Sequence, residues 1–152
     1  MDEMLDRLHR MHSELQALET DAERNPALGR RYAAPLAAGK PLVGQITKLI
    51  DAVYQPARQH GVSEDSLRNL IRLHQQVINA YDLVVFNYAQ RINGPIRRLM
   101  AERRRELDRA LARYNRFVAT AVARYNRIAA AAGAPSLMAG PPVRVAPIQK
   151  DI

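Results

Sequence analysis

The chain repeats an eleven-residue segment near its C-terminal end, and this repeat constrains the fold more than any other feature. Residues 110–120 read ALARYNRFVAT, and residues 121–131 read AVARYNRIAAA. Eleven residues make close to three turns of an α-helix, so equivalent positions of the two copies lie on nearly the same side of one helix. The repeat therefore predicts a single long helix with an apolar side and a basic side.

The apolar side of this helix, which is expected over residues 95–132, predicts packing against other helices. Its seam consists of Leu107, Leu111, Tyr114, Val118, Ala121, Tyr125, Ile128 and Ala132. We interpret the two tyrosines as core residues whose hydroxyls stay near the rim, with Asn115 and Asn126 beside them at the boundary. Gly133 and Pro135 are expected to end the helix.

The basic side carries seven arginines, which form a candidate site for an anionic partner. They are Arg98, Arg105, Arg109, Arg113, Arg116, Arg124 and Arg127. The first interpretation is a solvated face, partly neutralised by pairing of Glu102 with Arg105 and of Glu106 with Arg109. The second is contact with an acidic protein surface, including the acidic first helix of this chain or of a neighbour. The third is binding of nucleic-acid phosphates or an anionic membrane surface.

Two further helices are indicated in the first third of the chain. Apolar residues spaced alternately by four and three predict the first, which should end near Asn25-Pro26; they are Met4, Leu8, Met11, Leu15 and Leu18. Residues 25–40 read as a connector rich in Pro, Gly and Ala. Pro41 suits the first position of the next helix, whose apolar face is Leu42, Val43, Ile46, Leu49, Ile50 and Val53. Pro56 and Gly61 are expected to close it.

Ser63, Glu64 and Asp65 are a strong helix start, because serine caps free N–H groups and acids suit the positive end of the helix dipole. A wide apolar stripe follows, and it predicts the central, most buried helix: Leu67, Ile71, His74, Ile78, Tyr81, Val85, Tyr88 and Ile92. Asn93-Gly94-Pro95 then interrupts the pattern. It is either a turn between antiparallel helices or a kink in one long rod, and we favour the turn.

The last segment, residues 133–152, contains four prolines and few strong helix formers, so it is expected to be an extended tail. Val143, Val145 and Ile148 are its candidate contacts with a neighbouring molecule. Together these patterns predict an all-α, elongated antiparallel bundle of about four helices. We expect residues 1–132 to form the bundle domain and residues 133–152 to form the tail.

Charge and composition narrow the functional classes. The chain has a formal net charge of +8 and no cysteine, which removes disulfides and thiol chemistry. No apolar run is long enough to span a bilayer, and the acidic start is unlike a secretory signal, so a cytoplasmic or virion-interior location is expected. His9, His12 and His74 lack a metal-binding pattern and are interpreted as packed or surface residues. Neither a cofactor, a metal nor a catalytic residue set is predicted.

One segment resembles a known family. Tyr114-Asn115 and Tyr125-Asn126, followed by the sequence PSLMAG at residues 135–140, are similar to the C-terminal helix of LemA-family proteins. The resemblance covers residues 110–140, whereas the family's N-terminal signature is absent and its Tyr-Asn pairs lie closer together. It implies a long antiparallel helical bundle with no established enzymatic activity.

Two functions from different classes follow from these patterns. The first is a non-enzymatic structural subunit, of a phage, secretion-type or similar complex, that assembles through its helical seams and is tethered to a neighbour by its tail. It would work as a homo-oligomer or in a larger protein assembly. The second is a binder of nucleic acid or another anionic surface that uses the arginine side of the last helix.

Overall fold

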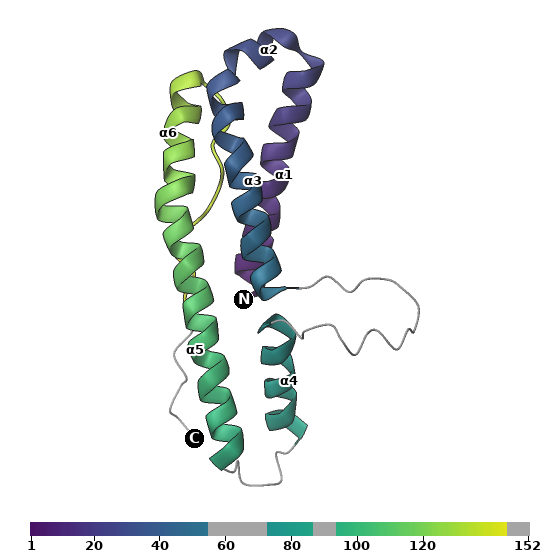
Figure 1. The fold of residues 1–152 in the computed structure, drawn as a ribbon, viewed down its shortest axis with the longest axis vertical. Coiled ribbons are helices and arrows are strands. Elements are labelled where there is room, and N and C mark those ends of the chain that lie inside the picture. The colour runs from purple at the N-terminus through teal and green to yellow at the C-terminus, as the bar shows by residue number, and fades with distance from the viewer. Residues whose placement is uncertain (55–72, 87–93, 146–152) are drawn as a thin grey trace, which may run out of the picture. The chain divides into compact units, whose positions relative to one another are not determined.

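The computed structural model describes residues 1–54, 73–86 and 94–145, and none of these residues lies in a β-strand (Figure 1). The predicted all-α class is therefore confirmed. The chain divides into two compact units, which are described separately. The first unit combines Met1–Leu49 with Leu111–Ile152, and the second is Ile50–Ala110.

The first helix, α1, extends over Asp2–Arg24 and confirms the predicted end near Asn25-Pro26. All five residues of its predicted seam are buried, together with Leu5. The helix ends because Asn25 adopts an extended conformation with φ −129° and precedes a proline. The Asn25 side chain then caps the next helix, α2 (Pro26–Arg31), by accepting hydrogen bonds from the backbone N–H groups of Ala27 and Leu28.

The prediction of a connector over residues 25–40 is wrong, because residues 26–31 form α2 and residues 33–40 belong to the next helix. Helix α3 covers Ala33–Val53 and includes Pro41 in its interior. Pro35 lies in the first turn, where backbone N–H groups have no helical partner, so it is compatible with the helix. Gly39 allows α3 to approach its neighbours closely, because a Cβ atom there would lie 3.0 Å from Leu15 Cδ2 and 3.7 Å from Tyr125 Cε2. Alanine, the strongest helix former, supplies four of residues 33–40 and offsets the cost of Gly39.

The helix predicted from the repeat is present but contains a wide turn. Helix α5 (Gly94–Phe117) is followed by a π-helical segment, η2 (Val118–Val122), and then by α6 (Ala123–Ala132). Successive buried residues are five apart across this segment, from Phe117 to Val122, because a π turn is wider than an α turn. Phe117 and Val122 therefore take the buried positions that the regular spacing assigns to Val118 and Ala121, which are half-buried.

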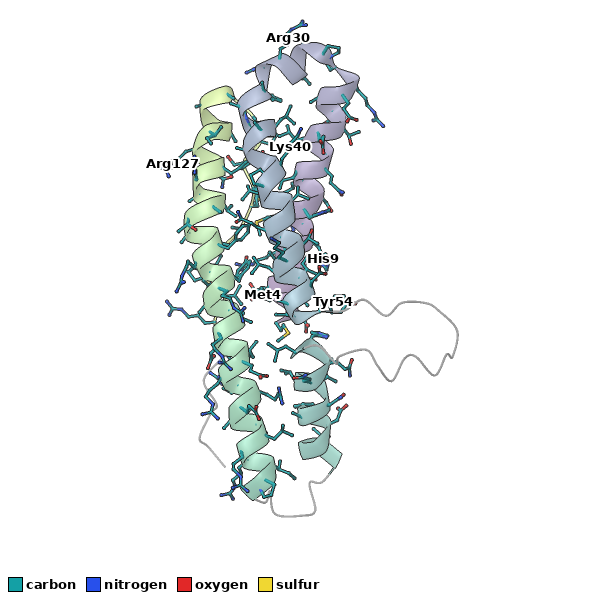
Figure 2. The ribbon with its side chains drawn as sticks, viewed as in Figure 1. Met4, His9, Arg30, Lys40, Tyr54 and Arg127 are labelled. Atoms are coloured by element: carbon teal, nitrogen blue, oxygen red, sulfur yellow. The ribbon has the colours of Figure 1, made fainter. Side chains whose placement is uncertain are left out.

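The core of the first unit lies between α1, α3 and the segment from Leu111 to Ala132, as the side chains in Figure 2 show. Tyr114 has no exposed surface, and Leu111 and Tyr125 are also buried. The remaining seam residues in this unit, Ile128 and Ala132, are half-buried. Helix α6 ends at Gly133, whose left-handed φ of 66° favours glycine and confirms the predicted stop.

In the second unit, α4 (Leu73–Phe86) lies beside the first part of α5. Arg103 donates a hydrogen bond to Gln76, 27 positions away. In one straight helix these residues would be about 40 Å apart, so the chain reverses between them. A reversal of the chain between α4 and α5 fits the predicted turn and not one kinked rod; Asn93, the first residue of the predicted turn, lies outside the described residues. Leu107 is half-buried here.

The prediction that α4 is the most buried helix is wrong for its described part. Ile78, Tyr81 and Val85 are 39%, 66% and 45% exposed. A helix packed on one neighbour buries only one side, so a wide apolar stripe extends beyond the contact. Pro56, Gly61 and the predicted helix start at residues 63–65 lie outside the described residues.

Candidate functional site

The tail returns along α6 and α5 in an extended conformation, and asparagine side chains hold it there (Figure 1). Asn126 makes a pair of hydrogen bonds with the backbone of Leu137. Its Nδ2 donates to the Leu137 carbonyl at 3.0 Å, and its Oδ1 accepts from the Leu137 N–H at 2.8 Å. One side-chain amide thus satisfies both backbone polar groups of one tail residue, as a neighbouring β-strand would.

Asn115, the equivalent residue in the first copy of the repeat, makes the same pair with Val143. Its Nδ2 donates to the Val143 carbonyl at 2.9 Å, and its Oδ1 accepts from the Val143 N–H at 3.0 Å. The Leu137 and Val143 side chains are each only 5% exposed. The repeated Tyr-Asn pair therefore combines a core tyrosine with an asparagine that binds the tail backbone.

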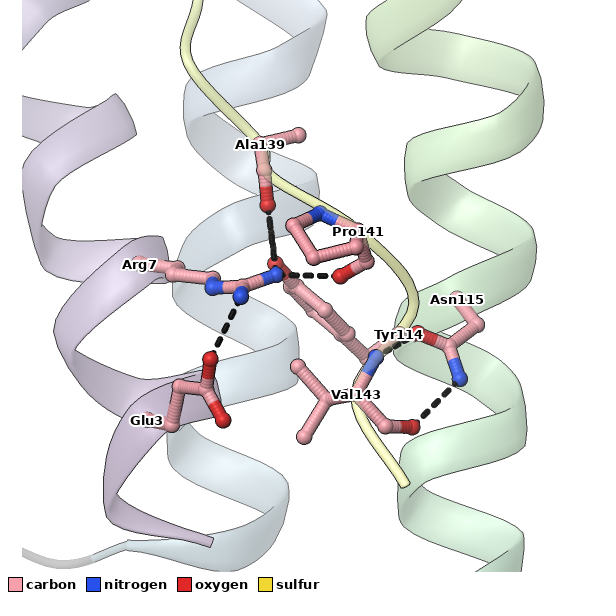
Figure 3. Close-up of polar contacts among 7 residues, drawn as sticks. All are labelled: Glu3, Arg7, Tyr114, Asn115, Ala139, Pro141 and Val143. Carbon is pink, nitrogen blue, oxygen red and sulfur yellow. Dashed lines mark hydrogen bonds and ion pairs between the residues drawn. The ribbon is translucent and has the colours of Figure 1, made fainter.

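Arg7 of α1 holds the tail between these two asparagines (Figure 3). Its guanidinium donates to the carbonyl oxygens of Ala139, at 2.8 Å, and Pro141, and it forms an ion pair with Glu3. The hydroxyl of Tyr114 also donates to the Ala139 carbonyl, at 3.4 Å. We call the surface formed by Arg7, Tyr114, Asn115 and Asn126 the tail track; it is defined by these four side chains.

A glycine lies where the tail passes Arg7. Gly140 has a left-handed φ of 67°, and a Cβ atom there would lie 2.8–3.0 Å from the guanidinium atoms of Arg7. The left-handed backbone conformation therefore favours glycine at this position, and a larger residue would also displace the end of the Arg7 side chain. Next to it, Glu14 accepts a hydrogen bond from the Met138 N–H at 3.4 Å.

Burial and charge perturb the ionisable groups of this region. Burial raises the pKa of Tyr114, although the hydrogen bond with Arg7 opposes this effect. Burial, aided by the negative charge of Glu14, also raises the pKa of Tyr125. Burial alone would lower the pKa of Arg7, but hydrogen bonds to Tyr114 and Glu3 and the charge of Glu3 raise it. Arg7 therefore binds the tail as a cation, which strengthens its hydrogen bonds to carbonyl oxygens.

The predicted arginine side of the long helix is exposed throughout. Arg98, Arg105 and Arg109 belong to the second unit. The other four, which we call the arginine face, belong to the first unit: Arg113, Arg116, Arg124 and Arg127. Figure 2 shows Arg127 pointing outward from α6.

The ion pairs expected to neutralise these arginines do not form among the residues that the structure describes. Glu102 and Glu106 pair with Arg103, and Asp108 pairs with Arg104. Glu106 bonds instead to the guanidinium of Arg103, which also donates a hydrogen bond to Gln76 of α4. In the described part of the chain, no member of the arginine face has an ion-pair partner.

The predicted tail contacts are distributed unevenly. Val143 is buried against its own chain, Val145 is half-buried, and Ile148 lies outside the described residues. The sequence interpretation missed the roles of Arg7, Asn115 and Asn126. The available signal was an asparagine repeated after eleven residues, next to a seam and upstream of a proline-containing tail.

The described residues show how His74 packs and contain neither a metal-binding cluster nor a helix suited to cross a membrane. His74 packs edge-on against Tyr54, with ring centroids 5.5 Å apart and planes at 83°. Among the described residues, no group of three or more histidines and acids is placed to hold a metal ion. None of the described helices combines the length and apolarity needed to cross a membrane.

Comparison with known proteins does not assign the chain to a family. No family model matches the chain, and no curated protein or solved structure matches it significantly. The resemblance of residues 110–140 to the LemA family stays a prediction from short motifs.

Proposed function

We propose that the protein is a non-enzymatic structural subunit that assembles through helical surfaces and through its tail. The observation that carries this proposal is the tail track. Its polar side chains bind the backbone of an extended polypeptide, and one apolar side chain is buried at each end, Leu137 at one and Val143 at the other. A surface of this kind serves protein–protein attachment.

The partners implied are further copies of the chain or other subunits of a larger assembly. The arginine face supplies a second docking surface, because four exposed guanidinium groups without intramolecular ion pairs in the described chain suit carboxylates of a neighbouring subunit. Such contacts would set the orientation of the neighbour and accelerate association at low salt.

Light scattering after size exclusion tests the assembly function. The proposal expects a mass that rises with concentration in the full-length chain. It also expects less association when Arg113, Arg116, Arg124 and Arg127 are replaced by Glu. A monomer at every concentration, together with no bound subunit after co-expression with neighbouring genes, would exclude this function.

The same exposed arginine face favours a second candidate, the binding of nucleic acid or another anionic polymer. If the four arginines contact four phosphates, the affinity should fall about 100-fold when the salt concentration rises from about 50 to about 200 mM. Fluorescence anisotropy with a DNA duplex and with single-stranded RNA measures this dependence. The fourfold Glu variant of the arginine face should lose binding while its circular dichroism stays unchanged.

A matched control distinguishes binding by the arginine face from attraction by the net positive charge of the chain. Arg10, Arg24, Arg30 and Lys40 are also exposed but lie on α1, α2 and α3. Replacing these four by Glu changes the formal charge equally. Equal loss of binding in both variants would show that net charge, rather than the arginine face, attracts the polymer.

A further inference from the structure

The tail track recognises a short pattern rather than any extended chain. Asn126 and Asn115 bind the backbones of Leu137 and Val143, whose side chains are buried. Between them, the positive φ of Gly140 favours glycine, and a Cβ atom there would displace the guanidinium of Arg7. The pattern that fits is therefore an apolar residue, then Gly three residues later, then a second apolar residue three residues after that. The chain's own tail carries this pattern.

The tail reaches the track through a very short reversal. The Gly133 N–H donates to the Ala130 carbonyl at 3.1 Å, and the Ala134 N–H donates to the Ala129 carbonyl at 2.9 Å. The direction of the chain thus changes within about two residues after α6. If this turn opens, the tail leaves its own track intact and available, and the same tail fits the track of an identical molecule.

We propose that the tail track accepts residues 134–145 of a second copy of the chain, so that subunits join by reciprocal exchange of their tails. This inference rests on the proposed assembly function and names the partner and the contact. Every hydrogen bond between the tail and the tail track is retained between subunits, so exchange changes only the hinge at Gly133. Short hinges favour swapping because a tight reversal leaves the chain few ways to fold back on its own helix.

The absence of cysteine allows a direct test in the full-length chain. Glu14 and Met138 are neighbours through the hydrogen bond between α1 and the tail, and the Met138 side chain is 67% exposed. One chain carries Glu14→Cys, the other carries Met138→Cys, and the two are unfolded together, refolded as a mixture and oxidised. Exchange predicts a disulfide-linked heterodimer joined between residues 14 and 138.

Two controls calibrate the yield. A chain carrying both substitutions should form the link internally, which shows that the two thiols are close enough. A mixture of Glu14→Cys with Gln45→Cys, an exposed position on α3, measures random collision. Docked thiols are held at an effective concentration of about 1 mM, so at about 10 µM protein the exchanged pair should exceed the collision control about 100-fold.

Complementation gives a second readout that needs no thiol. Asn115→Ala/Asn126→Ala damages the track and leaves the tail, whereas Leu137→Asp/Val143→Asp damages the tail and leaves the track. Exchange predicts that each variant alone is monomeric and that their mixture forms a dimer, which retains one intact tail–track pair. Light scattering measures both states.

The outcomes separate this inference from the function on which it rests. Heterodimers at the collision level, with no dimer on mixing the variants, overturn tail exchange. If the wild-type chain is nevertheless oligomeric, the assembly function stands and uses another surface. If the wild-type chain is also monomeric at all concentrations, both proposals are wrong.

Discussion

The contribution of the asparagine clamps to stability can be measured with one substitution. Asn126→Ala removes both hydrogen bonds to Leu137, whose side chain is buried beside α6. Two hydrogen bonds at about 1 kcal/mol each give an expected destabilisation of about 2 kcal/mol. For a chain of this size, that loss lowers the melting temperature by about 4–8 °C.

The matched control is Asn79→Ala on α4. Asn79 is also helical, is exposed, and bonds only to the side chain of Gln75 among the described contacts. Both substitutions gain the same helix propensity, so that gain cancels in the comparison. Because Asn79 binds no tail residue, its replacement should change stability by no more than about 0.5 kcal/mol.

Urea unfolding followed by circular dichroism measures the difference, and amide hydrogen exchange locates it. In Asn126→Ala the Leu137 N–H should exchange faster, whereas in Asn115→Ala the faster amide should be that of Val143. Equal stability of Asn126→Ala and Asn79→Ala, with an unchanged exchange rate at Leu137, would refute the reasoning. The tail would then be held by its apolar side chains alone.

Three further predictions follow from the same unit. The pKa of Tyr125 is raised above its ordinary value of 10.0, so the tyrosine of the unfolded chain loses its proton at a lower pH than that of the folded chain. The free energy of unfolding is therefore unaffected by this group below pH 10 and falls as the pH rises above it. Urea midpoints at about pH 8 and about pH 10.5 should therefore differ less in Tyr125→Phe than in the wild type. Gly140→Ala should destabilise by at least about 1–2 kcal/mol from its left-handed backbone, whereas Gly44→Ala, in open helix surface, should stabilise by about 0.5–1 kcal/mol; thermal melts compare them. Phe117→Ala should cost about 3–5 kcal/mol in chemical unfolding, and Val118→Ala much less; the reverse order would contradict the shifted seam.

Local periodicity predicted the parts of the fold that depend on one helix alone. The seam from Met4 to Leu18 specifies α1 because each residue lies at a helical spacing from the next. The proline and glycine content of residues 25–40 misled the prediction, since the reason for Gly39 is its closeness to Leu15 and Tyr125. Those residues are far from Gly39 in the sequence, so the residues next to Gly39 do not indicate the contact.

The width of an apolar stripe also fails to report how many neighbours a helix has. Tyr81 and Val85 continue the stripe of α4 but are exposed in the described unit. The π-helical segment at residues 118–122 is similarly hidden, because the repeat reads as continuous α-helix. For the candidate site, helical spacing predicted the exposed arginine face, but the pairing of Glu106 with Arg103 depended on which side of α5 contacts Gln76.

The length of the repeat matters because the distance between the two asparagines along the helix must match the distance between the two tail residues that they bind. Asn115 and Asn126 are separated by about 16 Å along the helix, at about 1.5 Å per residue. Leu137 and Val143 are six residues apart and would span about 18.6 Å in a polyproline II conformation at about 3.1 Å per residue. The tail is therefore about 2 Å longer than needed, and the left-handed bend at Gly140 takes up the excess while it directs two carbonyl oxygens at Arg7. Moving Asn126 by one position would rotate it by about 100° and break this match, so the repeat and the bent tail must change together.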